Sequence, residues 1–212
     1  MNTIIKQLSS IGTHIGHVKF KWNPNMENYL FGHINNLHIL DLEKTINILV
    51  KVKNLITKII EQNRKVLIVT DKDYSLTSNK NVQFAESSLL LNGCLTNLTS
   101  IKNIQNTILI NNQKRKKNIK FITSLPDLII ILNVDDNTSI IKEATLLNIP
   151  VIALVDSNNN PNVVTYPLPG NNESYKVKSF FLNYFIKVVN DVQISKKITF
   201  NNEFNLYSNC KI

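Results

Sequence analysis

The sequence is poor in glycine, which excludes the phosphate-binding loops of many nucleotide-dependent enzymes. Its 212 residues include five glycines: Gly12, Gly16, Gly32, Gly93 and Gly170. None of them forms G-x-G-x-x-G or a P-loop, whose glycines let the backbone approach a phosphate. Acids at Asp71 and Asp73, just after a predicted buried strand, would repel such a ligand. We therefore expect no nucleotide cofactor.

Cysteine is also scarce. Cys94 and Cys210 lie far apart in the chain, so no disulfide framework is implied and a reducing compartment is the simpler interpretation. His14 and His17 form an H-x-x-H pair, but a zinc site needs further ligands and neither cysteine lies nearby in sequence. We expect no metal site, and interpret these histidines as packing or phosphate-contacting residues.

Long apolar runs are missing as well. The longest, Leu128–Leu132, has the length of a buried strand, far short of the roughly 20 residues that cross a bilayer. The first eight residues lack the arginine- and serine-rich amphipathic pattern of an import presequence. We expect no membrane partner and no cleaved import signal.

Acids are absent from one stretch of a chain whose formal net charge is +9. Residues 102–120 contain only cations among their charged residues: Lys102, Lys114, Arg115, Lys116, Lys117 and Lys120. A basic excess indicates a polyanionic partner. Residues 121–170 are net acidic, so the positive charge gathers in one region. That distribution is typical of a protein that docks on RNA from one side.

Alanine, glycine and arginine are rare, whereas asparagine, isoleucine and lysine are abundant. The rare residues have mostly GC-rich codons and the abundant ones have AT-rich codons. We infer a strongly AT-biased gene, which is typical of organelle genomes and of a few nuclear ones.

Helix and strand patterns alternate after a loop-rich opening. Unbroken apolar strands between helices predict a parallel sheet covered on both faces. The predicted strands are 37–42, 66–70, 128–133 and 151–155, and the predicted helices are 42–62, 76–90, 138–147 and 174–192. The last residues, 193–212, have the pattern of a loosely attached tail.

The opening segment, Gly12–Met26, alternates Lys19 and Lys21 with Phe20 and Trp22. An extended chain would place both ammonium groups on one side and both rings on the other. The cations would then meet phosphates while the rings pack on the body or stack on bases. An edge strand with snorkelling lysines has the same pattern. The pattern alone leaves both interpretations open.

Three acids, Asp135, Asp136 and Asp156, follow two predicted buried strands. Open α/β sheets bind ligands at such strand ends, so one hypothesis is a metal-dependent phosphate-processing enzyme. The structural alternative is that Asp136 or Asn137 caps the next helix and Asp156 opens a turn. We favour the structural alternative and expect neither catalysis nor a small-molecule substrate.

A series of short motifs occurs in order between residues 8 and 190. They are Gly12-Thr-His-Ile-Gly-His17, Trp22-Asn-Pro-Asn-Met26, Tyr29-Leu-Phe-Gly32, Leu37-His-Ile-Leu-Asp-Leu-Glu-Lys-Thr45, Gly93-Cys-Leu-Thr-Asn97, Leu125-Pro-Asp127, Lys142-Glu-Ala144, Ile149-Pro150, Val155-Asp-Ser-Asn158 and Pro167-Leu-Pro-Gly-Asn171. Each is weak alone. The ordered set resembles the S-two family of small-subunit ribosomal proteins.

The resemblance implies a flavodoxin-like three-layer α/β domain with a parallel sheet. It implies a structural constituent of the small ribosomal subunit that lies between head and body and serves translation. The implied partners are small-subunit ribosomal RNA and neighbouring ribosomal proteins. A fold shared with nucleotide-binding proteins brings no nucleotide chemistry with it.

One departure from the family bears on the source of the chain. Bacterial relatives carry a long helical hairpin between the segments that match Leu95–Asn97 and Leu125–Asp127. Here Leu125 lies only 28 positions after Asn97, so we expect the hairpin to be shortened or lost, with the basic run 114–117 as its remnant. Together with the AT-biased coding, this favours a mitochondrial ribosome, with a plastid ribosome as the alternative.

We therefore predict an RNA-facing extension at 1–36, a core domain at 37–192 with a basic connector at 98–124, and a tail at 193–212. The predicted phosphate contacts are Lys19, Lys21, Lys102, Lys114, Arg115, Lys116 and Lys117. Residues predicted to position the loop or touch sugar and phosphate are His17, Asn23, Thr96 and Asn97, with Trp22 as a packing anchor. A protein-docking module without RNA contact is the remaining alternative.

Overall fold

The structure is a computed structural model that describes residues 2–71, 81–90, 92–98, 122 and 124–209. The predicted basic connector, with the cations of 102–117 and the site of the shortened hairpin, lies almost entirely outside these residues. The predictions for that segment therefore stay predictions.

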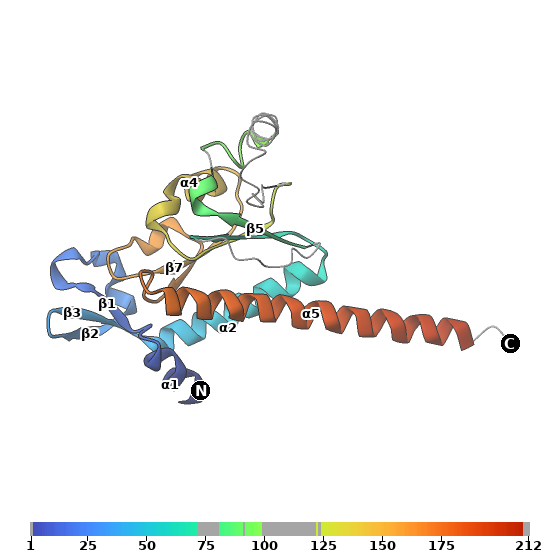
Figure 1. The fold of residues 1–212 in the computed structure, drawn as a ribbon, viewed down its shortest axis with the longest axis horizontal. Coiled ribbons are helices and arrows are strands. Elements are labelled where there is room, and N and C mark those ends of the chain that lie inside the picture. The colour runs from blue at the N-terminus through green and yellow to red at the C-terminus, as the bar shows by residue number, and fades with distance from the viewer. Residues whose placement is uncertain (1, 72–80, 91, 99–121, 123, 210–212) are drawn as a thin grey trace, which may run out of the picture.

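Five parallel strands form the central sheet (Figure 1), in the order β5-β4-β6-β7-β8. Their bounds are Val66–Thr70 for β4, Val82–Glu86 for β5, Leu128–Ile131 for β6, Val151–Val155 for β7 and Tyr166–Pro169 for β8. Counted along the chain, this order is 2-1-3-4-5, the order of flavodoxin-like domains. The predicted fold class is confirmed.

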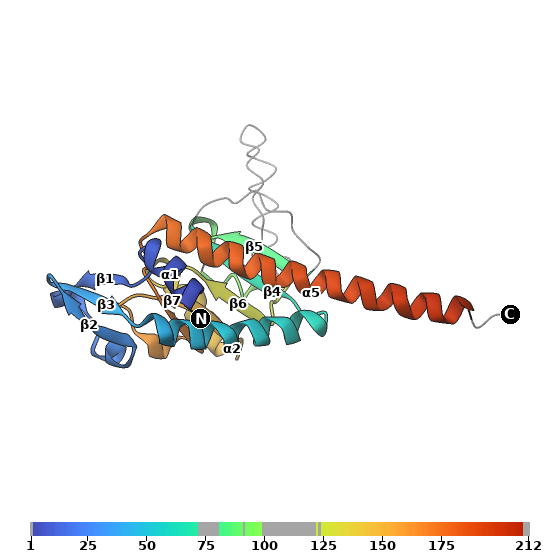
Figure 2. The ribbon, with the colours of Figure 1, turned by 90° about the horizontal axis from the view of Figure 1, so that it is seen from below.

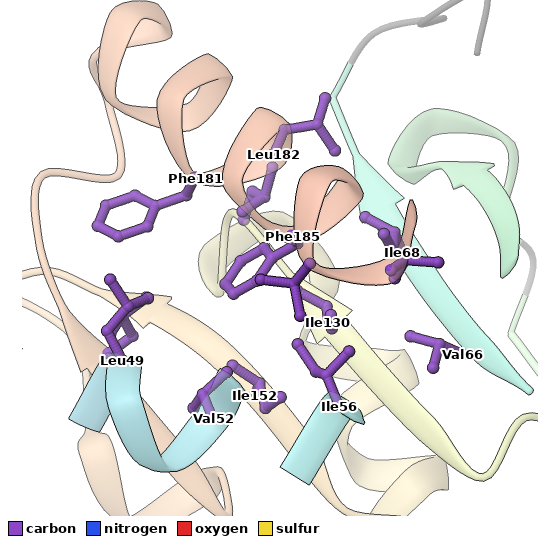
Figure 3. Packing of buried hydrophobic residues seen from close by; sticks show 14 of the residues in the cluster. Leu49, Val52, Ile56, Val66, Ile68, Ile130, Ile152, Phe181, Leu182 and Phe185 are labelled. Atoms are coloured by element: carbon purple, nitrogen blue, oxygen red, sulfur yellow. The ribbon is translucent and has the colours of Figure 1, made fainter. Parts of the chain in front are cut away.

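Two helices, α2 (Leu42–Glu61) and α5 (Tyr175–Asn209), cover one face of this sheet (Figure 2). Figure 3 shows their contact with the strands through side chains that are at most 4% exposed: Leu49, Val52 and Ile56 of α2, Phe181, Leu182 and Phe185 of α5, and Val66, Ile68, Ile130 and Ile152 of the sheet. Burying one such side chain stabilises the fold by about 1.5–3 kcal/mol.

The opposite face packs on α4 (Thr138–Leu146) and on the loop that contains Leu95. Alternate strand residues turn to this side, among them Leu67, Val69 and Ile129, none of which is exposed. The strands are thus buried on both faces, which explains their unbroken apolar sequence and confirms the prediction of a covered parallel sheet.

A second, antiparallel sheet precedes the domain, and we call it the β-ribbon. It consists of β1 (Ile15–Val18), β2 (Leu30–Ile34) and β3 (Leu37–Leu40) in the order β1-β3-β2. Asn35 and Asn36 join β2 to β3 with φ of 48° and 63°, the left-handed backbone of a tight hairpin turn. The β-ribbon lies at the end of the molecule opposite the C-terminus (Figure 1).

The predicted loop-rich opening contains more regular structure than expected. A helix, α1 (Asn2–Ser10), precedes the β-ribbon and anchors itself through Leu8, which is fully buried in the main core. Because β3 pairs with β1 and β2, the small sheet also spans the predicted domain boundary at residue 36. In the described part of the chain, no helix combines the length and the apolarity that a membrane span requires.

Two edge strands differ from the sequence prediction. Residues 82–86, placed in a predicted helix, form β5, since pairing with β4 decides the state of a short apolar segment that fits either periodicity. The strand β8 was not predicted, because it contains Pro167 and Pro169. Proline is tolerated at a sheet edge, where its missing N–H breaks no ladder.

The helices α2 and α4 lie within one residue of their predicted bounds, and the Asp41 carboxylate caps α2 by accepting from Glu43 N at 3.0 Å. The last helix, α5, instead continues to Asn209, through most of the segment predicted as a tail. It projects past the body (Figures 1 and 2). Lys196 fixes it to the end of α2 by donating to Ile60 O at 2.6 Å and to Asn63 Oδ1 at 2.8 Å.

Candidate nucleic-acid interface

The segment that carries the first predicted RNA contacts is attached to the carboxyl ends of β7 and β8. Ser157, just after β7, receives two hydrogen bonds at 2.8 Å, from Asn23 N to its carbonyl and from His17 N to its hydroxyl. Asn171, just after β8, donates from its backbone to Thr13 O at 3.1 Å. These bonds hold the base of the β-ribbon on the sheet.

Gly16 explains why the motif around His17 contains a second glycine. A Cβ at this position would lie 2.8 Å from Ser157 Oγ and 3.2 Å from Asp156 Oδ1. Any larger residue would push β1 away from the loop after β7. The close approach therefore favours glycine at position 16.

Below this contact lies a polar network built from the ends of three strands. Asp156 is 1% exposed and accepts from Ser157 N at 2.5 Å. Asn159 Oδ1 accepts from Asp156 N and from Asn172 Nδ2, each at 3.0 Å, while Asn159 Nδ2 donates to Asp135 Oδ1 at 2.7 Å. The acids thus serve as acceptors for neighbouring amides, in agreement with the structural interpretation.

The predicted cap of α4 is only half right. Asn137 does occupy the N-cap position, but its side chain donates to Ser87 Oγ at 3.0 Å and to Asn133 O at 2.7 Å and makes no capping bond. Asp136 accepts from Asn133 Nδ2. Within the described ranges, no three histidine, cysteine or acidic residues are grouped so that they could hold a metal ion.

His17 lies between two carboxylates. Its Nδ1 is 3.2 Å from the buried Asp156 Oδ2, and its Nε2 is 2.9 Å from the exposed Glu173 Oε1. Ionised carboxylates only accept, so both contacts are hydrogen bonds when both ring nitrogens carry protons. The contacts join His17 to the segments that follow β7 and β8. The predicted role of His17 at an RNA contact stays a prediction.

The lysine segment is not extended, so the expected alternation of two faces is wrong. Lys19–Lys21 form the 3-10 helix η1, in which successive residues are about 120° apart and positions i and i+2 do not share a side. Phe20 is 93% exposed and does not pack on the body. Lys19 N donates to Asn36 O at 2.8 Å, next to the pair of Val18 and Leu37, and the chain bends from there.

The two cations are nevertheless available to a ligand. Lys19 and Lys21 are exposed, and neither has an acidic partner among the residues that the structure describes. Trp22 lies with its ring centroid 5.5 Å from that of His38, as expected of a packing anchor. Asn23 caps the following 3-10 helix, η2 (Pro24–Tyr29), by accepting from Asn25 N at 3.0 Å.

Thr96 and Asn97 belong to a separate loop on the α4 side of the sheet. Glu143 of α4, 9% exposed, accepts from Gly93 N at 2.6 Å, Leu95 N at 2.8 Å and Thr96 N at 3.2 Å. This carboxylate shapes the loop and leaves Thr96 and Asn97 at the surface. The role of Glu143 cannot be seen in the sequence, because no local pattern connects this residue with residues about fifty positions earlier.

Burial, and secondarily the nearby Glu143 carboxylate, raises the pKa of the Cys94 thiol from 9.0 to about 12. The side chain is 4% exposed. Thiolate is the reactive form of cysteine, and the raised pKa keeps the Cys94 thiol protonated. Cys94 is therefore a packing residue of this loop.

The chain is similar to one known protein family and to several curated proteins. A sequence model of the family described as Ribosomal protein S2 matches residues 8–118 and 104–191. The matched range contains the β-ribbon, the whole parallel sheet and the start of α5.

Several bacterial relatives are similar over most of the chain, each named small ribosomal subunit protein uS2. The protein of Francisella tularensis strain SCHU S4 is 31% identical, with 90% of this chain and 93% of the relative covered. For Bartonella quintana strain Toulouse the identity is 30%, with 87% and 84% covered. For Rickettsia conorii the identity is 30%, with 85% and 72% covered.

Proposed function

Since the chain belongs to the ribosomal protein S2 family, we propose that it is a structural component of the small ribosomal subunit and serves translation. The observation that carries this proposal is the family match from residue 8 to residue 191, which contains almost the whole α/β domain. Relatives that share about 30% of their residues over most of their length carry the name of a small-subunit protein. The family is structural, and the chain is not an enzyme.

The proposed partners are small-subunit ribosomal RNA and neighbouring ribosomal proteins. Lys19 and Lys21 support an RNA contact because they are exposed and have no acidic partner in the described part of the chain. They lie on η1. The residues on either side of η1, His17 and Asn23, donate backbone hydrogen bonds to Ser157 and so hold this segment in place. We propose that they bind phosphates, and that the run 114–117 and Lys102 add further phosphate contacts.

The rival hypothesis of a phosphate-processing enzyme has no remaining support. Asp135 and Asp156 are occupied by the amides of Asn159 and Ser157, and Asp136 by Asn133. The hydrogen bonds of these acids fasten the strand ends together, which is a structural role.

We propose that the chain lies between the head and body of the subunit, with a reduced hairpin. The alignment with the Francisella protein runs over 222 positions, more than the 212 residues of this chain, although it covers only 90% of them. Positions of the relative therefore have no counterpart in this chain. A deletion in the connector 98–124 agrees with this difference.

The ribosome that we propose is mitochondrial, with a plastid ribosome as the alternative. This proposal rests on the residue usage of an AT-biased gene and on the short connector. The bacterial relatives support the ribosomal role of the chain, but they do not indicate in which compartment its ribosome lies.

Sequencing the RNA that copurifies with the tagged native protein tests both parts of the proposal. We expect small-subunit ribosomal RNA, with a sequence from the mitochondrial genome. Small-subunit RNA from another genome would remove the mitochondrial assignment alone. The absence of ribosomal RNA would overturn the function.

A further inference from the structure

One face of the β-ribbon is aliphatic and uncovered. The register pairs Ile15 with Ile39. It also pairs both Val18 and Ile34 with Leu37. Directly paired residues of an antiparallel sheet lie on the same side, and so do alternate residues of a strand. These five side chains therefore share one surface, which we call the aliphatic face.

Four of its five members are exposed, and Ile39 is partly buried. Ile34 is 63% exposed, Val18 40%, Ile15 38% and Leu37 36%. Gly32, which pairs with Ile39, has no heavy atom within 4 Å of where a Cβ would stand. A single exposed aliphatic residue needs no explanation, but a contiguous group on a rigid sheet is typical of an interaction site.

The chemistry of the aliphatic face fits protein better than RNA. Phosphates require cations, and unpaired bases stack on aromatic rings or guanidinium groups. None of the five side chains is cationic or aromatic, since the lysines and Phe20 follow β1 in the bent segment η1. Of the two rings on β2, His33 pairs with His38 on the other side, and the 81% exposed Phe31 lies at the irregularity between Leu30 and Gly32. Branched aliphatic side chains instead match the same kind of side chain on a partner.

One edge of the β-ribbon is free to accept that partner. The strand β1 is closed off by the loop after β7, where Gly16 comes close to Ser157. Within the described chain, β2 pairs with β3 alone, and four of its five residues are exposed. A strand added beside β2 would extend the aliphatic face outward from Ile34.

We propose that β2 and the aliphatic face bind an extended segment of a neighbouring small-subunit protein by strand addition, with aliphatic residues at alternate positions of the segment. The face has four exposed aliphatic side chains, whereas each partner in a stable complex contributes roughly 20–30 residues and about 800 Å². The face is therefore too small for a dimer of this chain, and it suits a segment that other contacts hold within a particle. The inference thus rests on the proposed function.

Site-specific crosslinking in the assembled particle tests the inference. A diazirine-bearing residue at position 34 should attach to a peptide of another small-subunit protein, and the backbone amides of β2 should exchange more slowly in the particle than in the free chain. The same residue at position 146, which is 76% exposed on α4, gives the reference level. Attachment to RNA, to a second copy of this chain, or only at the reference level would overturn the inference.

A charge variant provides the second readout. Ile34→Lys should abolish the slow exchange and weaken retention of the chain during salt washing by about tenfold, because one aliphatic contact is replaced by an unpaired charge. Leu146→Lys is the matched control and should be retained as the native chain is. A native chain that never enters the particle defeats the proposed function, whereas entry without the β2 protection defeats this inference alone.

Discussion

At the scale of single residues, Gly16 shows how closely the β-ribbon approaches the sheet. Gly16→Ala would place a methyl group 2.8 Å from Ser157 Oγ, so we expect a loss of about 1–3 kcal/mol in the free energy of unfolding. Gly32→Ala, on the same ribbon but with open space around it, should change stability by less than about 0.5 kcal/mol. Urea unfolding of the two variants measures the difference, and equal stability would contradict the packing described.

Glu143 is the second residue whose role the structure makes testable. Glu143→Gln replaces an accepting oxygen with a donor that faces backbone N–H groups of the 93–97 loop. We expect a loss of about 1–3 kcal/mol in the free energy of unfolding. Glu61→Gln, at the exposed end of α2, should change it little. If both substitutions had the same small effect in urea unfolding, the carboxylate would not be shaping the loop.

Cys94 gives a prediction about pH. Its pKa is raised to about 12 in the folded chain from an ordinary 9.0, so folding favours the neutral thiol. Its contribution to stability is complete below pH 9 and is lost as the pH rises from 9 towards 12. Alkylation at pH 9 should therefore spare Cys94 in the folded protein and modify it in urea, as peptide mass spectrometry can measure. Equal labelling in both states would contradict the burial.

At the scale of elements, η1 is the proposed RNA contact within the described structure. The double variant Lys19→Ala/Lys21→Ala should weaken binding to small-subunit ribosomal RNA without changing sequence preference. The slope of affinity against salt should fall by about two, one for each lost phosphate contact. Lys51→Ala/Lys53→Ala on the exposed face of α2 is the control. An unchanged salt slope in filter-binding titrations would remove η1 from the interface.

The elements that the sequence predicts well are those buried on both sides or amphipathic over several turns. The strand β7 is an unbroken apolar run, and α2 repeats its buried residues every three or four positions after the Asp41 cap. In these elements local preference and tertiary packing agree, so the pattern suffices.

The elements that it misses depend on partners distant in sequence. Pairing with β4 makes β5 a strand, and a sheet edge is what allows the prolines of β8. The bend at η1 begins beside the contact of Lys19 with Asn36 in the turn between β2 and β3, and the support of the Thr96 loop comes from Glu143. Such contacts leave no periodic pattern in the sequence. The sequence can therefore indicate which residues belong to the candidate site, but it does not indicate how they are arranged.

At the scale of the whole molecule, two parts of the described chain project from the parallel-sheet domain. The polar network around Asp156 fixes the β-ribbon at one end, and α5 projects past the body towards the other (Figure 1). Such a shape suits a protein that connects neighbouring surfaces within a larger particle.

The central claim is that this chain is a constituent of the small ribosomal subunit, and sucrose-gradient sedimentation of the native protein tests it most directly. We expect the protein to sediment with small subunits in a ratio near one to one at physiological salt, and to be released from them as the salt concentration rises. Recovery of the protein at the top of the gradient, while other small-subunit proteins stay in the particle, would contradict it.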